Sequence, residues 1–296
     1  MTQQSTADFH PEIFKLFDSY VHGLISRQNF LNGIGEFCTD GQSAEDVLDA
    51  LSPRFNQNPS NRTDDPSITT TTVEFPSPDG YGFVRGYMAR PVEPSARLAT
   101  ILVVHENRGL NPHIEDIVRR LAFSGFIAFA PDALHPLGGY PGDEDKAREL
   151  FGQLDQTKTR NDFLAAVKAL KHLPEGNANV GVVGFCYGGG IASFLATKVE
   201  DLGAAVSFYG NPPKVEDVVN IKSQVQIHLA EHDERINSGW PGYEAALKAS
   251  GVRYEAYIYP GTQHGFNNDT TPRYDATAAA LAWQRTLAFL ETHLTT

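Results

Sequence analysis

In this 296-residue sequence, the residues whose types and spacing most clearly indicate catalytic chemistry form the pattern Gly184-x-Cys186-x-Gly188. An apolar run, residues 180–185, precedes the cysteine, and a stretch of small residues typical of a helix follows it. This is the pattern of a nucleophile elbow, G-x-S-x-G, with cysteine in place of serine. Larger side chains at the two glycines would collide with neighbouring backbone in so tight a turn. The helix N-terminus would favour a thiolate and a developing oxyanion. We therefore predict that Cys186 is a nucleophile.

A nucleophile on such a turn needs an acid and then a histidine, each just after a later strand. Asp233 follows the apolar run 225–229, and His264 follows the run 254–259. Both would lie at the carboxyl ends of their strands, the edge where ligands bind in open α/β sheets. We predict that Asp233 and His264 are the partners of Cys186. Two neighbours of the aspartate remain rivals: Glu231 and His232.

Two backbone amides are expected to hold the oxyanion. The first is the N–H of Tyr187, which comes directly after the nucleophile. The second is assigned to Asn107, because the loop after the first parallel strand (100–104) turns there.

The strands and helices that position these residues alternate along the chain from residue 68 onward. A hairpin comes first, with strands at 69–75 and 83–89 and a Pro/Gly-rich turn between them. Nearly continuous apolar runs follow at 100–104, 126–130, 180–185, 204–208, 225–229 and 254–259. Helical patterns lie between and after them at 112–124, 143–172, 188–198, 239–249 and 275–292. This alternation predicts a doubly wound, mostly parallel sheet with helices on both faces.

The first 52 residues have a different pattern, with apolar residues at helical spacing. A polar tract rich in Pro, Asn and Asp then runs to residue 66 and is typical of a linker. We predict an N-terminal helical extension with linker over residues 1–66 and a catalytic domain over 67–296. The apolar faces of the extension (Phe14, Phe17, Phe30, Leu31) should pack on the catalytic domain or on a second subunit. A homo-oligomer formed through these helices is one expectation.

Composition and charge exclude several classes of protein. The chain has 24 basic and 36 acidic residues and no run of Lys or Arg, so we expect no nucleic-acid partner and no membrane partner. No apolar stretch approaches the roughly 18 residues of a membrane span. Ser26 fits a helix N-cap better than part of an export signal. Two cysteines, Cys38 and Cys186, fit a reducing compartment, and we expect a cytoplasmic protein.

Metal and nucleotide chemistry find no support in the sequence. There is no Walker loop, no G-x-G-x-x-G and no metal-ligand spacing, so we expect no cofactor and no metal. A cysteine redox function is disfavoured because no C-x-x-C is present. Several further histidines are scattered and lack convergent partners: His10, His22, His113, His172 and His293.

Four short segments together resemble the dienelactone hydrolase family of α/β hydrolases. They are 105–109 (His-Glu-Asn-Arg-Gly), 184–189 (Gly-Phe-Cys-Tyr-Gly-Gly), 231–233 (Glu-His-Asp) and 264–266 (His-Gly-Phe). The resemblance covers residues 70–292 and implies an α/β-hydrolase fold with Cys186, Asp233 and His264 as the catalytic triad. It also implies that Glu106 holds or deprotonates the resting thiol. From the residues alone, Glu106 could equally be a solvated carboxylate or pair with Arg108.

The sequence departs from this family where a substrate carboxylate would bind. Family members that cleave dienelactone clamp it with two arginines, but the matching segments here, 131–136 and 264–268, contain none. Arg108, Arg235 and Arg273 could replace them or could form structural ion pairs. Aromatic pocket candidates, each of which could equally be simple packing, are Tyr140, Tyr209, Trp240 and Phe266. We expect a metal-independent hydrolase of small esters or lactones. The alternative is a catalytically weak homologue with a binding or structural role.

Overall fold

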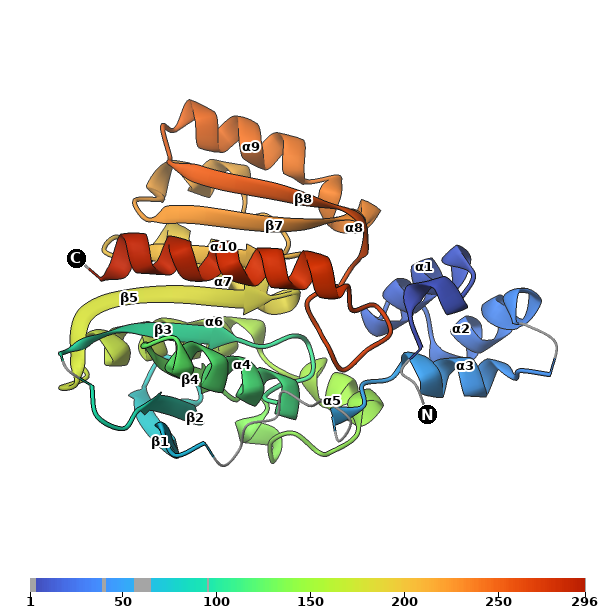
Figure 1. Ribbon diagram of the computed structural model, residues 1–296, viewed down its shortest axis with the longest axis horizontal. Helices are drawn as coiled ribbons and strands as arrows, with labels where there is room; N and C mark the ends of the chain where they lie inside the picture. The colour runs from blue at the N-terminus through green and yellow to red at the C-terminus, as the bar shows by residue number, and fades with distance from the viewer. Residues whose placement is uncertain (1–3, 39–40, 56–64, 95, 296) are drawn as a thin grey trace.

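An eight-stranded sheet forms the centre of the computed structural model, which describes residues 4–38, 41–55, 65–94 and 96–295 (Figure 1). The strands are arranged in the order β1-β2-β4-β3-β5-β6-β7-β8. Pairing is antiparallel between β1 and β2 and between β2 and β4, and parallel elsewhere, which confirms the predicted mostly parallel sheet. The strand bounds are β1 Ile68–Ser77, β2 Gly82–Pro91, β3 Leu98–Val104, β4 Ile127–Pro131, β5 Gly176–Phe185, β6 Ala204–Phe208, β7 Gln224–His232 and β8 Tyr254–Gln263.

The central strands are mostly apolar, as expected where helices cover both faces of a sheet. Every residue of β4 and β6 is buried, as are the last six residues of β3 and of β5. One apolar cluster joins the sheet to α6 (Gln156–Lys171), α7 (Tyr187–Lys198) and α9 (Trp240–Ala249). The other joins it to α4 (Pro112–Phe123) and α10 (Ala276–Leu294).

One predicted helix is wrong in its extent. Residues 143–172 form two helices, α5 (Glu144–Phe151) and α6, rather than one. The break arises because Asp155 caps the second helix, accepting hydrogen bonds from the backbone N–H groups of Thr157 and Lys158. Among the described residues, none of the helices combines the length and the apolar character needed to cross a bilayer.

The described part of the N-terminal extension includes the α-helices α1 (Pro11–Val21), α2 (Arg27–Ile34) and α3 (Ala44–Leu51). Their apolar faces pack mainly on one another and form a small core of their own. The rings of Tyr20 and Phe30 stack within it, with centroids 5.3 Å apart. Figure 1 shows the extension beside one end of the sheet. Its apolar core shares no residue with the two sheet-bound clusters. Most of the predicted linker, residues 56–64, lies outside the described residues.

Candidate active site

The predicted nucleophile sits on a strained turn between β5 and α7. Cys186 has a positive φ of 55°, an uncommon conformation for a residue with a side chain. Its N–H donates to the carbonyl of Phe208 on the neighbouring strand at 3.0 Å. A Cβ at Gly184 would lie 1.9 Å from the carbonyl oxygen of Gly188, and one at Gly188 would lie 2.1 Å from that of Val104. Both glycines are therefore required by close backbone approach, as the sequence pattern suggested.

Asp233 and His264 meet beside this turn. His264 Nδ1 lies 2.6 Å from Asp233 Oδ2, and both side chains are buried. Asp233 opens the short helix α8 (Glu234–Asn237) at the end of β7, and His264 directly follows β8. The carboxylate fixes the proton on Nδ1, so Nε2 is free to accept a proton. Among the described residues Nε2 has no hydrogen-bond partner, and a ring nitrogen of His264 lies within 4.8 Å of Cys186 Sγ.

Electrostatics at this site favour a charged thiolate. Burial would raise the pKa of the Cys186 thiol, but the nearby imidazoles of His264 and His22 outweigh burial and lower it to about 6. Burial likewise opposes the charged form of His264, yet Asp233 and the Cys186 sulfur raise its pKa to about 10. Between these two values, the thiolate and the His264 imidazolium form a mutually stabilised pair.

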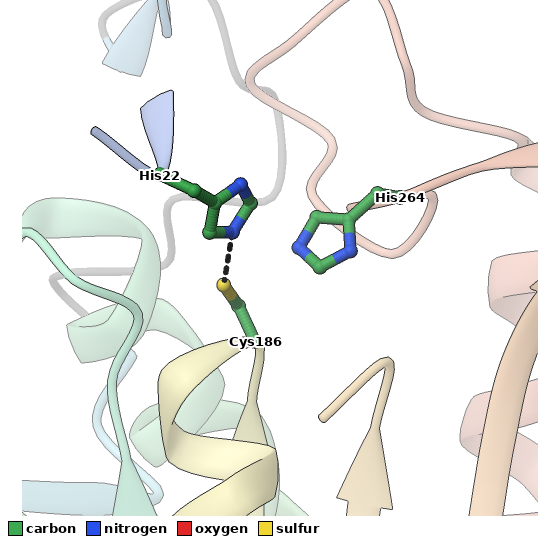
Figure 2. A group of neighbouring side chains, drawn as sticks. All are labelled: His22, Cys186 and His264. Atoms are coloured by element: carbon green, nitrogen blue, oxygen red, sulfur yellow. Dashed lines mark hydrogen bonds between the residues drawn. The ribbon is translucent and has the colours of Figure 1, made fainter. Parts of the chain in front are cut away.

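A residue that the sequence analysis dismissed, His22, also reaches the nucleophile. Its Nε2 lies 3.3 Å from Cys186 Sγ, and its ring meets that of His264 edge to face with centroids 5.0 Å apart (Figure 2). The expectation that His22 lacks convergent partners is therefore wrong. His22 directly follows α1, so a separately folded part of the chain contributes to the site. No local pattern signalled this, because His22 and Cys186 are 164 residues apart.

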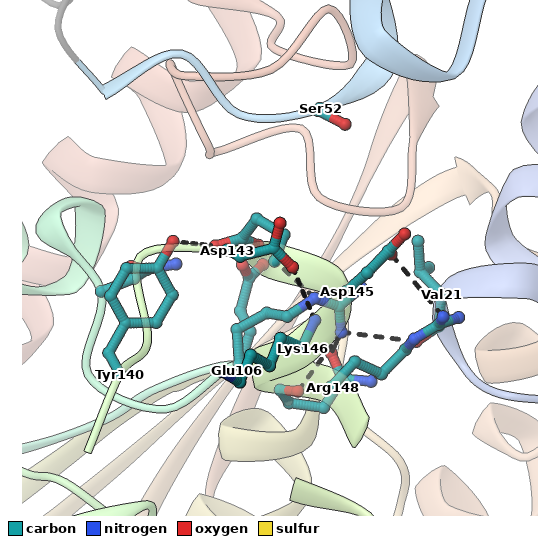
Figure 3. A network of polar contacts seen from close by, with 12 residues as sticks. Val21, Ser52, Glu106, Tyr140, Asp143, Asp145, Lys146 and Arg148 are labelled. Atoms are coloured by element: carbon teal, nitrogen blue, oxygen red, sulfur yellow. Dashed lines mark hydrogen bonds and ion pairs between the residues drawn. The ribbon is translucent and has the colours of Figure 1, made fainter. Parts of the chain in front are cut away.

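The last turn of α1 is held against the core by polar contacts. Arg148 of α5 donates to the carbonyl of Tyr20 at 2.5 Å and lies 4.0 Å from the centre of its ring. Asn107 Nδ2 donates to the carbonyl of Val21 at 2.8 Å. Figure 3 shows this network, with Val21 and Arg148 among the residues drawn. Cationic and amide donors suit these carbonyls, because a helix C-terminus carries partial negative charge.

Two sizeable cavities adjoin the predicted catalytic residues. One, of about 330 Å³, is lined by the nucleophile and by both residues predicted to form the oxyanion hole: Cys186, Tyr187 and Asn107. The other, of about 440 Å³, is lined by Asp18, Asp233 and His264 and lies between α1 and the core. The first cavity offers a small substrate direct access to the sulfur.

Comparison with protein-family models supports the sequence resemblance. Residues 84–294 match the model of the dienelactone hydrolase family, which is more than half of the chain. The chain belongs to the dienelactone hydrolase family. It is therefore a hydrolase with the α/β-hydrolase fold. A second model, described as YqhI-like, matches residues 1–35, a range that includes α1 and α2.

Individual relatives of this dienelactone hydrolase family member agree with the assignment. The "putative carboxymethylenebutenolidase" of Saccharolobus solfataricus is 31% identical over 243 residues, covering 70% of this chain and 93% of that protein. Protein usf of Aquifex pyrophilus is 36% identical over 226 residues, covering 72% and 94%. The crystal structure of a "putative dienelactone hydrolase" from Klebsiella pneumoniae is 27% identical, covers 75% of this chain and 98% of its own, and has a TM-score of 0.67.

Glu106 occupies the loop position that the dienelactone hydrolase resemblance assigned to it. It lines a small cavity together with Cys186 and His264. Its Oε2 accepts a hydrogen bond from Asn268 at 3.4 Å, whereas the closest hydrogen-bond partner of the sulfur is His22. A role for Glu106 at the resting thiol stays a prediction.

The three candidate arginines have different surroundings. Arg108 is buried, with Nε 3.4 Å from the carboxylate of Glu144, which also accepts from the Tyr140 hydroxyl at 2.8 Å. Arg235 binds Asp18 of the extension at 3.1 Å. Arg273 lies over the ring of Phe17 at 5.1 Å, and it lines both the larger cavity and the small one. Arg108 also donates to the carbonyl of Val21 at 3.5 Å, so all three arginines contact the extension.

The remaining aromatic candidates differ in their distance from the chemistry. Tyr209 lies against His264, with ring centroids 4.9 Å apart, and lines the 330 Å³ cavity. Phe266 packs behind Tyr209 and is fully buried. Trp240 packs on Tyr243 and Tyr254, and it lines none of the cavities described above.

Within the described chain, one group of His, Cys, Asp or Glu residues could hold a metal ion: His22, Cys186 and His264. Two imidazoles and one thiolate are suitable zinc ligands. However, the Arg235 guanidinium lies 2.9 Å from His22 Nε2, and its positive charge opposes a cation at this point.

Proposed function

We propose that this protein hydrolyses small carboxylic esters or lactones through a Cys186–His264–Asp233 triad and a thiol-ester intermediate. One observation carries the proposal. A cysteine on a strained elbow lies beside an imidazole whose Nδ1 is 2.6 Å from a buried carboxylate and whose Nε2 is unpaired. The carboxymethylenebutenolidase name of its relatives supports ester or lactone cleavage.

The proposed reaction has two halves. The Cys186 thiolate attacks the carbonyl carbon, and the N–H groups of Tyr187 and Asn107 stabilise the oxyanion. The ester C–O bond breaks, and the leaving oxygen takes a proton from the His264 imidazolium. Once the sulfur is acylated and uncharged, the neutral His264 accepts a proton from water. The resulting hydroxide displaces the acyl group, and the thiolate and the imidazolium are restored.

The surroundings of the site favour small substrates with little charge. A cavity of about 330 Å³ is at the small end of the range for ligand pockets. Arg108 is paired with Glu144, so the cation nearest the oxyanion loop is already neutralised. We therefore propose that neutral esters are turned over at least as well as carboxylated lactones.

The test is a panel of activated esters and lactones, assayed with the wild type and three variants. Cys186→Ala and His264→Ala should abolish hydrolysis. Cys38→Ala is the matched control because its thiol lies within the extension and donates to the carbonyl of Ile34. Full activity in Cys186→Ala or His264→Ala would refute the triad. Strong preference for a dicarboxylic lactone, lost in Arg273→Ala, would refute the proposed substrate class.

A further inference from the structure

The sulfur of Cys186 lies between two histidine–carboxylate pairs of similar design. On the core side, Asp233 binds His264 Nδ1 at 2.6 Å. On the extension side, His22 Nδ1 lies 2.7 Å from the backbone carbonyl of Asp18 and 3.1 Å from the carboxylate of the same residue. His22 Nε2 lies within hydrogen-bond distance of the sulfur, at 3.3 Å (Figure 2).

The partners of His22 determine which of its nitrogens carries the proton. A backbone carbonyl can only accept, so the short contact to the Asp18 carbonyl requires a proton on Nδ1. In the neutral ring, Nε2 is then a proton acceptor that faces Sγ, just as in His264. The side chain of His22 is only 14% exposed, which limits competition from water.

The charged groups that face His22 have opposing effects on its protonation. Burial lowers the pKa of His22, but the Cys186 thiolate and the Asp18 carboxylate outweigh it, so the pKa lies above its usual value. The nearby His264 imidazolium opposes this shift. The Arg235 guanidinium, 2.9 Å from Nε2, opposes it as well but also stabilises the thiolate. Arg235 Nε also donates to the Asp18 carboxylate at 3.1 Å, a hydrogen bond that does not involve His22 Nε2.

We propose that His22 is a second catalytic base for Cys186, supplied by the N-terminal extension. The inference rests on the proposed thiol chemistry and adds a residue to it. When the resting thiol ionises, the S–H bond breaks, the proton moves to the neutral Nε2 of His22 instead of to His264, and the electron pair stays on Sγ. The thiolate then forms the S–C bond to the substrate carbonyl. When the ester C–O bond breaks, the leaving oxygen takes this proton from His22. The neutral His22 then accepts a proton from water, and the resulting hydroxide displaces the acyl group from Sγ and restores the thiolate.

Another histidine of the chain, His172, occupies the same kind of position at a helix end without any contact to the sulfur. His172 follows α6 as His22 follows α1, and its Nδ1 also binds the carbonyl four residues back, at 2.8 Å. His172 is exposed and contacts no catalytic residue. A histidine at this kind of helix end therefore needs no sulfur partner. His172→Gln and His172→Ala are the matched controls for the loss of a helix-end hydrogen bond.

The experiment measures thiol ionisation and hydrolysis in full-length His22→Gln, His22→Ala and the two His172 controls. Iodoacetamide alkylation is followed against pH, with Cys38→Ala as the common background. In the His22 variants the midpoint should rise from about 6 to between about 7 and 8, toward the value of about 8.5 for a free thiol. Alkylation at pH 7 should then fall between roughly twofold and tenfold, and kcat/KM about tenfold to hundredfold. Added imidazole should restore part of the rate of His22→Ala.

The outcomes distinguish failure of the inference about His22 from failure of the proposed function. If the His22 variants keep the wild-type pH midpoint and kcat/KM, His22 has no catalytic role and the inference is wrong. If His22→Ala loses activity without a change of midpoint and without rescue by imidazole, the residue is only structural, which also overturns it. If His264→Ala is fully active, the proposed function itself fails, whatever the His22 variants do. His172→Gln and His172→Ala should match the wild type throughout.

Discussion

The α/β core and the N-terminal extension both place side chains beside the sulfur of Cys186, but they position those side chains by different physical means. The core places Cys186, Asp233 and His264 at the carboxyl ends of three parallel strands, so their positions follow from the sheet itself. The extension folds around its own small apolar core and presents one helix end through hydrogen bonds and ion pairs. Substitution of the residues positioned by strands should therefore strongly reduce activity. The extension, in contrast, should unfold in a transition separate from that of the core.

The largest effect should come from the core pair. In Asp233→Asn the side chain can no longer accept from His264 Nδ1 as a carboxylate, so the imidazole loses its orientation and its stabilised cation. We expect kcat to fall about 10⁴-fold, the size typical of this change in a triad. Asp18→Asn is the matched change on the extension, where the backbone carbonyl still holds His22. Equal losses of kcat in the two variants would show that the two carboxylates are equally important, contrary to the proposed difference between core and extension.

The second effect concerns the separate apolar core of the extension. Phe30 is fully buried there and stacks on Tyr20, so Phe30→Ala should destabilise the extension by about 3–5 kcal/mol. Calorimetry should show an earlier transition for the extension and an unchanged melting temperature for the core. Phe83→Ala, which removes a ring that is 59% exposed, is the control. A single transition that moves as a whole would mean that the two regions unfold together.

The third effect is the pH dependence of the nucleophile. A thiol whose pKa is lowered to about 6 stays ionised until the pH falls through that value. Alkylation of Cys186 should therefore rise between about pH 5 and pH 7 and then level off, rather than rising around 8.5. Measurement in the Cys38→Ala background isolates this thiol. A midpoint near 8.5 would show that the two imidazoles do not act on the sulfur.

The smallest effect should come from the contact that holds the extension. Arg148→Ala removes the hydrogen bond to the Tyr20 carbonyl and the stacking of the guanidinium on its ring. Charged hydrogen bonds of this kind contribute about 1.5–3 kcal/mol, so hydrogen exchange in α1 should accelerate while the strands stay protected. Arg160→Ala, which removes a similar contact with the ring of Phe194, is the control. Unchanged exchange in α1 would mean that other contacts suffice to hold it.

The sequence predicted the core well because the core depends on repeated patterns. Apolar runs indicated six of the strands and a hairpin pattern indicated the first two, while the glycines around Cys186 indicated the turn before its geometry was known. Where a single side chain decides the structure, prediction was weaker. The cap at Asp155 split one predicted helix into two. His22 was missed because a polar contact between separately folded regions leaves no periodic signal in either segment.

The short helix α8 connects the two regions mechanically. Asp233 at its start orients His264, and Arg235, two residues later, holds Asp18 of α1. A ligand that shifts α8 while bound at the sulfur must therefore also change how tightly the extension binds. By thermodynamic linkage, docking of the extension then changes the affinity for that ligand by the same factor. Occupancy of the catalytic cavity and seating of the N-terminal helices thus form one coupled equilibrium, with α8 as the shared element.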